Sequence, residues 1–170
     1  PMFYFPANVC KEIARQCSLR GVPLPEVSIS CDDIWAAYRS IPNAQENFSI
    51  VAVYSFQRKC VLYFAVKGHS FGLVSSVVHF NRLPPISRGG CAAICGLMHS
   101  FVDDYCAMDL KIGRGSGQQA LVSLHEEVGF DFEDSKRKFA TDESDDSLTF
   151  IGVITDTSKF KESGEISFRP

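Results

Sequence analysis

The chain lacks several signals that mark specialised classes of protein. No stretch approaches the roughly 18 uninterrupted apolar residues of a membrane span, and the first residues do not run from basic to apolar as a signal peptide does. Internal repeats and low-complexity segments are also missing. With 170 residues, 45% of them hydrophobic, the chain can still build one domain with a core. We therefore expect a soluble intracellular protein with no membrane partner.

Paired cysteine motifs are absent as well. The seven cysteines stand singly in apolar segments, and Cys91-x3-Cys95 has no second ligand pair to complete a zinc site. An odd number of cysteines without a secretory signal argues against a disulfide framework. We expect these residues to be buried free thiols.

Basic residues are scarce relative to acidic ones. There are 17 Lys and Arg against 20 Asp and Glu, which gives a net charge of −3 and a pI near 5.8. Nucleic-acid binders normally present a basic face, so composition by itself disfavours such a partner. A nucleic-acid partner would require basic surface from other parts of a longer protein.

The sequence does contain two pairs of adjacent aspartates in apolar surroundings. Asp32-Asp33 ends an apolar run, and Asp103-Asp104 follows Phe101-Val102. Neighbouring carboxylates repel each other and lose hydration, so a fold that keeps them usually supplies a cation. This pattern predicts a site for Mg²⁺ or Mn²⁺ built from Asp33 and Asp103 with Asp104 beside them.

Hydrophobic periodicity and turn residues predict an α+β chain, with an antiparallel sheet and helices packed on one face. Pro84-Pro85 is expected to stop a helix, and the segment 101–108 is expected to form a hairpin with the acidic pair at its turn. Helices are predicted at 7–19, 34–39, 74–83, 90–99 and 118–128, and strands at 26–31, 48–55, 60–66, near 130–132 and at 148–154.

Five segments in order resemble the palm domain of reverse transcriptases, especially those of retrotransposons, and the resemblance covers residues 24–170. They are the strand-Asp segment Val27–Pro42, the glycine segment Ser70–Ser76 continuing to Leu83, the hairpin Phe101–Asp104, Gly129-Phe130 with Lys136, and the strand Leu148–Ile154. Each motif alone is weak, since Asp-Asp and Phe-Gly pairs are common. The alternative for the whole set is coincidence in an unrelated α+β domain.

The resemblance implies an RNA-directed DNA polymerase, a nucleotidyltransferase that adds a dNTP to a primer 3′-hydroxyl on an RNA or DNA template. Two Mg²⁺ or Mn²⁺ ions would be held by Asp33, Asp103 and Asp104 and by the backbone carbonyl of Ile34. Lys136 would neutralise or protonate the departing pyrophosphate. Its neighbours Arg137 and Lys138 leave open that this charge run is a solvated face.

The same resemblance assigns the substrate contacts. Tyr38 would exclude a ribose 2′-hydroxyl, Phe71 would pack beside the incoming nucleotide, and Gly72 would let the backbone approach the base pair. Phe150 and Gly152 would belong to the primer grip. Tyr38 and Phe71 could instead be core aromatics. Asp32 is expected to be a solvated or capping neighbour of the true ligand.

The domain division that follows has three parts. Residues 1–25 would be a helical remnant of the fingers/palm junction, 26–156 the palm, and 157–170 a primer-grip tail with the thumb absent. The chain would then be part of a retroelement polyprotein. The alternative is a catalytically inactive reverse-transcriptase-like remnant that acts at most as a binding module.

Overall fold

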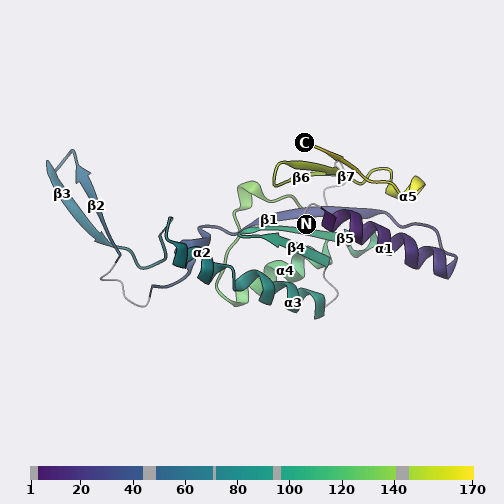
Figure 1. Cartoon of the computed structure of the whole chain (residues 1–170), viewed down its shortest axis with the longest axis horizontal. Helices are drawn as coiled ribbons and strands as arrows, with labels where there is room; N and C mark the ends of the chain where they lie inside the picture. The colour runs from purple at the N-terminus through teal and green to yellow at the C-terminus, as the bar shows by residue number, and fades with distance from the viewer. Residues whose placement is uncertain (1–3, 44–48, 71, 94–96, 141–145) are drawn as a thin grey trace. The chain divides into compact units, whose positions relative to one another are not determined.

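A computed structural model describes residues 4–43, 49–70, 72–93, 97–140 and 146–170 of the chain. These form two compact units, one of Pro1–Trp35 with Pro84–Pro170 and the other of Ala36–Leu83. Helices and antiparallel sheets are mixed, which confirms the predicted α+β class (Figure 1). The finer division at residues 25 and 156 stays a prediction.

A three-stranded antiparallel sheet is the centre of the first unit. Its order is β1 (Val27–Asp33), β5 (Asp104–Leu110) and β4 (Leu97–Phe101). Residue pairs across β1 and β5 run without interruption from Val27 opposite Leu110 to Asp33 opposite Asp104. The alternating pattern that predicted β1 is therefore confirmed, and the strand extends through both aspartates.

Two helices, α3 (Leu83–Ala93) and α4 (Ser116–Glu127), cover one face of this sheet (Figure 1). The buried ring of His125 on α4 lies 4.8 Å from the ring of Tyr105 on β5. Its Nδ1 bonds the carbonyl of Leu121 at 2.9 Å, so Nε2 is left to accept the hydroxyl of Ser87 on α3 at 3.1 Å. Burial lowers the pKa of His125, and the neutral imidazole joins both helices to the sheet.

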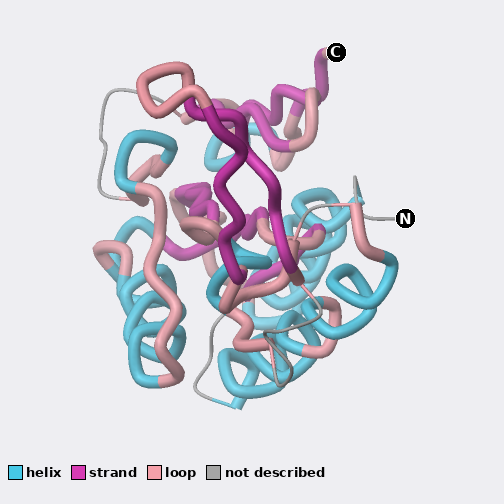
Figure 2. Tube along the Cα trace, turned by 90° about the vertical axis from the view of Figure 1, so that its left-hand side faces the viewer, coloured by secondary structure: helices cyan, strands magenta, loops and turns pink. Residues whose placement is uncertain are grey.

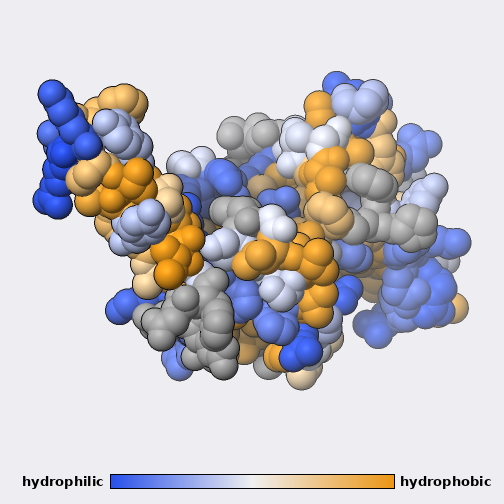
Figure 3. Space-filling view, turned by 60° about the vertical axis from the view of Figure 1, so that its left-hand side comes forward, coloured by the Kyte–Doolittle hydropathy of each residue, from blue (hydrophilic) through white to orange (hydrophobic). Residues whose placement is uncertain are grey.

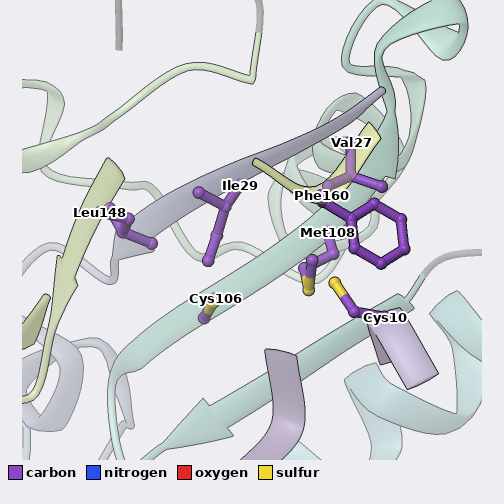
Figure 4. Packing of buried hydrophobic residues seen from close by; sticks show 7 residues of the cluster. All are labelled: Cys10, Val27, Ile29, Cys106, Met108, Leu148 and Phe160. Atoms are coloured by element: carbon purple, nitrogen blue, oxygen red, sulfur yellow. The ribbon is translucent and has the colours of Figure 1, made fainter. Parts of the chain in front are cut away.

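The other face of the sheet carries α1 (Phe5–Arg20), α5 (Phe160–Ser163) and a second antiparallel sheet of β6 (Ser147–Phe150), β7 (Val153–Asp156) and β8 (Ser167–Arg169). A cluster of buried side chains joins these elements (Figure 4). Its members are Cys10, Val27, Ile29, Cys106, Met108, Leu148 and Phe160.

The described cysteines are free thiols, as predicted, but not all of them are buried. Cys10, Cys91 and Cys106 are buried, whereas Cys60 is exposed. The expectation of burial is wrong for Cys60, which lies in a two-stranded hairpin whose described residues are mostly exposed.

The region around Pro84-Pro85 differs from its prediction. The helix predicted at 74–83 ends early, as α2 (Val74–Phe80), and α3 begins at Leu83 with both prolines in its first turn. Proline is tolerated there because the first N–H groups of a helix have no intrahelical acceptor. The helix predicted at 90–99 is wrong, since α3 ends at Ala93 and residues 97–101 form β4.

The single strand predicted at 148–154 is also wrong, because the segment folds back on itself as the β6–β7 hairpin. Phe150 pairs with Val153, and the two residues between them have positive φ, 50° for Ile151 and 73° for Gly152. Two consecutive left-handed residues make the tight turn whose twist suits antiparallel strands. Glycine adopts that conformation at no steric cost.

The second unit contains the 3-10 helix η2 (Ala37–Ser40), α2 and a hairpin of β2 (Ile50–Ser55) and β3 (Cys60–Ala65). The hairpin is confirmed, with Ser55 opposite Cys60 (Figure 2). Apolar side chains gather on its surface (Figure 3). The large exposed ones on this hairpin are Ile50, Val51, Val53, Tyr54, Phe56, Val61, Tyr63 and Phe64.

Candidate functional site

Three predicted acidic residues meet at one end of the central sheet. Asp33 ends β1 and lies opposite Asp104, which begins β5. Asp103 stands in the turn between β4 and β5, where the preceding Val102 has φ 55°. The backbone N–H of Ile34 donates to the carbonyl of Asp103 at 3.0 Å. Antiparallel pairing thus brings together aspartates that are about seventy residues apart in the chain.

The carboxyl groups repel one another electrostatically. Loss of hydration, followed by the charges of Asp33 and Asp103, raises the pKa of Asp104 from 3.8 to about 6. Burial and the charge of Asp33 also raise the pKa of Asp103. Lys136 opposes both shifts. The raised pKa values indicate that these carboxyl groups are stabilised by binding a proton or a cation.

Lys136 lies at this cluster, at the end of the 3-10 helix η5 (Asp134–Lys136). Its ammonium group forms an ion pair with Oδ2 of Asp33. The side chain of Lys136 remains 63% exposed, and the bond to Asp33 raises the pKa of its ammonium group. The predicted site lysine is therefore next to the predicted site aspartate, on a side of the sheet that solvent reaches.

Asp32 faces the opposite side of the sheet and is not a solvated neighbour, so that expectation is wrong. It is 1% exposed because the face toward which it points is covered by α4. The guanidinium Nε of Arg137 donates to its Oδ1 at 2.9 Å, and the amide of Gln118 donates to both carboxylate oxygens at 3.1 and 3.0 Å. Burial raises the pKa of Asp32, and these donors act against that rise.

Arg137 and Gln118 lie beside the site, and the sequence does not single out either of them. The sequence leaves open that Arg137 belongs to a solvated run with Lys136 and Lys138, yet its side chain is only 14% exposed. A signal was available, because a doublet of acids on a strand presents one carboxylate to each face and a doublet of bases can match both. Gln118 gave no signal of its own.

Two of the predicted substrate residues, Tyr38 and Gly72, belong to the second unit. The ring of Tyr38 packs edge-on against Phe80 at 5.4 Å between centroids. Gly72 has φ 85°, and a Cβ added there would meet no atom within 4 Å, so its conformation rather than crowding favours glycine. Phe71 lies outside the described residues.

The remaining predicted residues are in the first unit. The side chain of Ile34 is 2% exposed and packs in the core, which leaves only its backbone for a role in binding. Phe150 is partly buried against the apolar cluster, and Gly152 occupies the β6–β7 turn. Their assignment to a primer grip stays a prediction.

The acidic cluster has the right chemistry for a hard metal ion, since carboxylate oxygens are the ligands that Mg²⁺ and Mn²⁺ prefer. Within the described ranges, however, no group of three His, Cys, Asp or Glu side chains is arranged to hold an ion. Lys136 supplies a positive charge to Asp33. The metal site predicted from Asp33, Ile34, Asp103 and Asp104 therefore stays a prediction.

Comparisons with known proteins add a likeness of fold. No protein-family model and no curated protein matches the chain. Telomerase from Candida albicans, solved in complex with a TWJ fragment of telomeric RNA, superposes with a TM-score of 0.55 at 13% sequence identity. The likeness shows the fold alone. It covers 95% of this chain but 34% of that one, so this chain spans about a third of the neighbour's length.

Among the helices of the described segments, none combines the length and the apolar character that crossing a bilayer requires.

Proposed function

We propose that this chain is the palm of an RNA-directed DNA polymerase from a retroelement, which transfers nucleotides from dNTPs to a primer 3′-hydroxyl. The observation that carries the proposal is the meeting of Asp33, Asp103 and Asp104 at one sheet end, beside a paired lysine. The order of the five motifs supports it, as does the fold shared with telomerase, which was solved in complex with RNA.

The acidic residues would act as ligands. Asp33, Asp103 and Asp104, with the carbonyl of Ile34, would hold two Mg²⁺ or Mn²⁺ ions. When bound, such ions activate the primer hydroxyl and stabilise the negative charge of the leaving pyrophosphate. The raised pKa of Asp104 gives a physical reason for an added cation, because positive charge relieves the repulsion among these carboxylates.

Lys136 would serve the leaving group. The bond to Asp33 raises the pKa of the exposed Lys136 ammonium group, so this group is fully charged at neutral pH. A charged lysine can neutralise a phosphate oxygen or donate a proton to it. To do so, the ammonium would exchange Asp33 for the pyrophosphate as its partner.

The remaining residues would select and hold the substrates. The ring of Tyr38 would favour deoxyribose, and Phe71 and Gly72 would lie against the nascent base pair of template and dNTP. Phe150 and Gly152 would contact the DNA primer. These roles come from the resemblance of their motifs, and the positive φ of Gly72 agrees with a position reserved for glycine.

Primer extension on an RNA template tests the proposal. The wild-type chain should incorporate dNTPs in Mn²⁺ or Mg²⁺, and Asp103→Asn should reduce incorporation at least a hundredfold. Glu12→Gln is the matched control, since it removes one negative charge from an exposed site on α1. Equal incorporation by wild type and Asp103→Asn would contradict the proposal, and no incorporation by the wild type would favour the inactive binding module or a palm that needs the rest of a longer protein for activity.

A further inference from the structure

Two consecutive acids on β1 face two consecutive bases on the segment 131–138. Asp33 pairs with Lys136 on one face of the sheet, and Asp32 pairs with Arg137 on the other. The first pair is reached by solvent at its lysine end, whereas the second is almost entirely buried. Lys136 of the outer pair, Asp33–Lys136, can therefore exchange its partner for another anion. The inner pair, Asp32–Arg137, is fixed by its burial.

The guanidinium of Arg137 is held on several sides. Nε donates to Asp32 at 2.9 Å, and a terminal nitrogen donates to Asp134 at 3.2 Å. The rings of Phe132 and Phe139 lie 5.8 and 4.8 Å from its central carbon, within the range of cation–π attraction. Lysine cannot reproduce this combination of directed donors and flat stacking surface.

Gln118 ties the inner pair to α4. Its amide nitrogen lies 3.0 Å from the carbonyl of Lys138 as well as within bonding distance of Asp32, and its amide oxygen accepts the N–H of Ala140 at 2.9 Å. The side chain is 5% exposed. One glutamine thus fixes the carboxylate, and the chain just beyond Arg137, to the same helix.

Backbone bonds anchor the segment on either side of the lysine. The N–H of Glu133 donates to the carbonyl of Asp33 at 2.8 Å, and Cys31 and Lys138 exchange two bonds of 3.2 and 3.0 Å. Between these anchors the chain leaves the sheet as η5. Arg137 follows Lys136 directly and lies between these two sets of backbone bonds, with its side chain mostly buried.

We propose that Arg137 is a positioning residue: seated between Asp32 and Gln118, it holds the segment 133–138 against β1 so that the Lys136 ammonium stays at Asp33. The role of Lys136 toward pyrophosphate rests on the proposed function. The positioning of Lys136 by Arg137 does not depend on that function.

The choice of variants follows from the burial of Asp32. Removing Arg137 alone leaves a buried carboxylate without its counter-charge, and such a change can prevent folding. The double variant Asp32→Asn, Arg137→Gln removes both charges and keeps an uncharged polar side chain at each position. Arg137→Lys is the conservative variant, because it keeps the charge but loses the directed Nε donor.

Zero-length carbodiimide crosslinking measures the position of Lys136, because it joins an amine to a carboxyl only where the two are in contact. Peptide mass spectrometry would quantify the Asp33–Lys136 crosslink. The exposed ion pair between Lys161 and Glu26, 2.5 Å apart, is an internal control in the same molecule. We expect the double variant to lose the Asp33–Lys136 crosslink at least fivefold with the control crosslink unchanged, and Arg137→Lys to keep an intermediate yield.

Two results would overturn the inference. One is a wild-type yield of the Asp33–Lys136 crosslink in both the double variant and Arg137→Lys, with the control crosslink intact. The other is no Asp33–Lys136 crosslink in the wild type. The crosslinking reaction contains no nucleotide and no metal. If the proposed polymerase activity is absent, primer extension will show it, and the yield of the Asp33–Lys136 crosslink will not change.

Discussion

Replacing Asp104 by Asn should stabilise the metal-free protein at neutral pH. The pKa of Asp104 rises from 3.8 to about 6 on folding, so the folded chain holds a proton that the unfolded chain releases between those values. A raised carboxyl pKa contributes stability that is complete below about pH 4 and is lost as the pH rises through 6. At 1.36 kcal/mol for each pKa unit, the loss has an upper limit of about 3 kcal/mol.

The expected effect is smaller than this limit, because Asp104 is only partly buried and solvent screens its interactions. We expect Asp104→Asn to gain about 1–2 kcal/mol in the free energy of unfolding at pH 7.5 relative to wild type, and little at pH 4. Urea unfolding from pH 4 to 7.5 in the presence of a chelator measures both values.

Asp156→Asn provides a control of opposite sign for this experiment. Bonds from Ser158 lower the pKa of Asp156, so its contribution to stability is present above the unfolded pKa and is lost on acidification. The asparagine variant should therefore be less stable than wild type at pH 7.5. If Asp104→Asn is also destabilising at pH 7.5, or if its difference from wild type does not change with pH, the repulsion assigned to the acidic cluster is wrong.

Two further predictions concern the scaffold. Gly152→Ala should cost about 1 kcal/mol in urea unfolding because φ is 73°, whereas Gly89→Ala, exposed in α3 with no atom near its added Cβ, should gain about 0.5 kcal/mol. A loss in both variants would refute this account of the turn. Asp109→Ala should cost about 1 kcal/mol, because Oδ2 of Asp109 accepts from Gly117 N at 3.0 Å and from the hydroxyl of Ser116 at the start of α4. Asp109→Asn keeps an acceptor and should lose less; equal losses would contradict the capping role.

Local patterns were enough to predict β1 and the acidic turn at Asp103, although most of β4 was predicted as helix. Alternation located β1, and the two aspartate pairs marked the ends of strands that the antiparallel register then joins. The β2–β3 hairpin and α4 followed from the same rules of period and turn chemistry. In these segments the local preference agrees with the tertiary fold.

Predictions failed where one signal had two meanings. Pro84-Pro85 can end a helix or begin one, and the choice depends on the chain that follows. The run 148–154 is apolar enough for one strand, but a turn through Ile151 and Gly152 divides it. Asp32 is buried under α4 and bonded by Arg137, which lies 105 positions away; the matching doublets of acids and bases hint at this pair, but they do not say which face of the sheet a helix covers.

Manganese titration asks whether the acidic cluster is a cation site. We expect the wild-type chain to bind Mn²⁺ in a calorimetric titration at pH 7.5, and the double variant Asp33→Asn, Asp103→Asn to lose this binding. Glu12→Gln should bind as the wild type does. Identical isotherms for the wild type and the double variant would contradict the claim that these two carboxylates form a cation site.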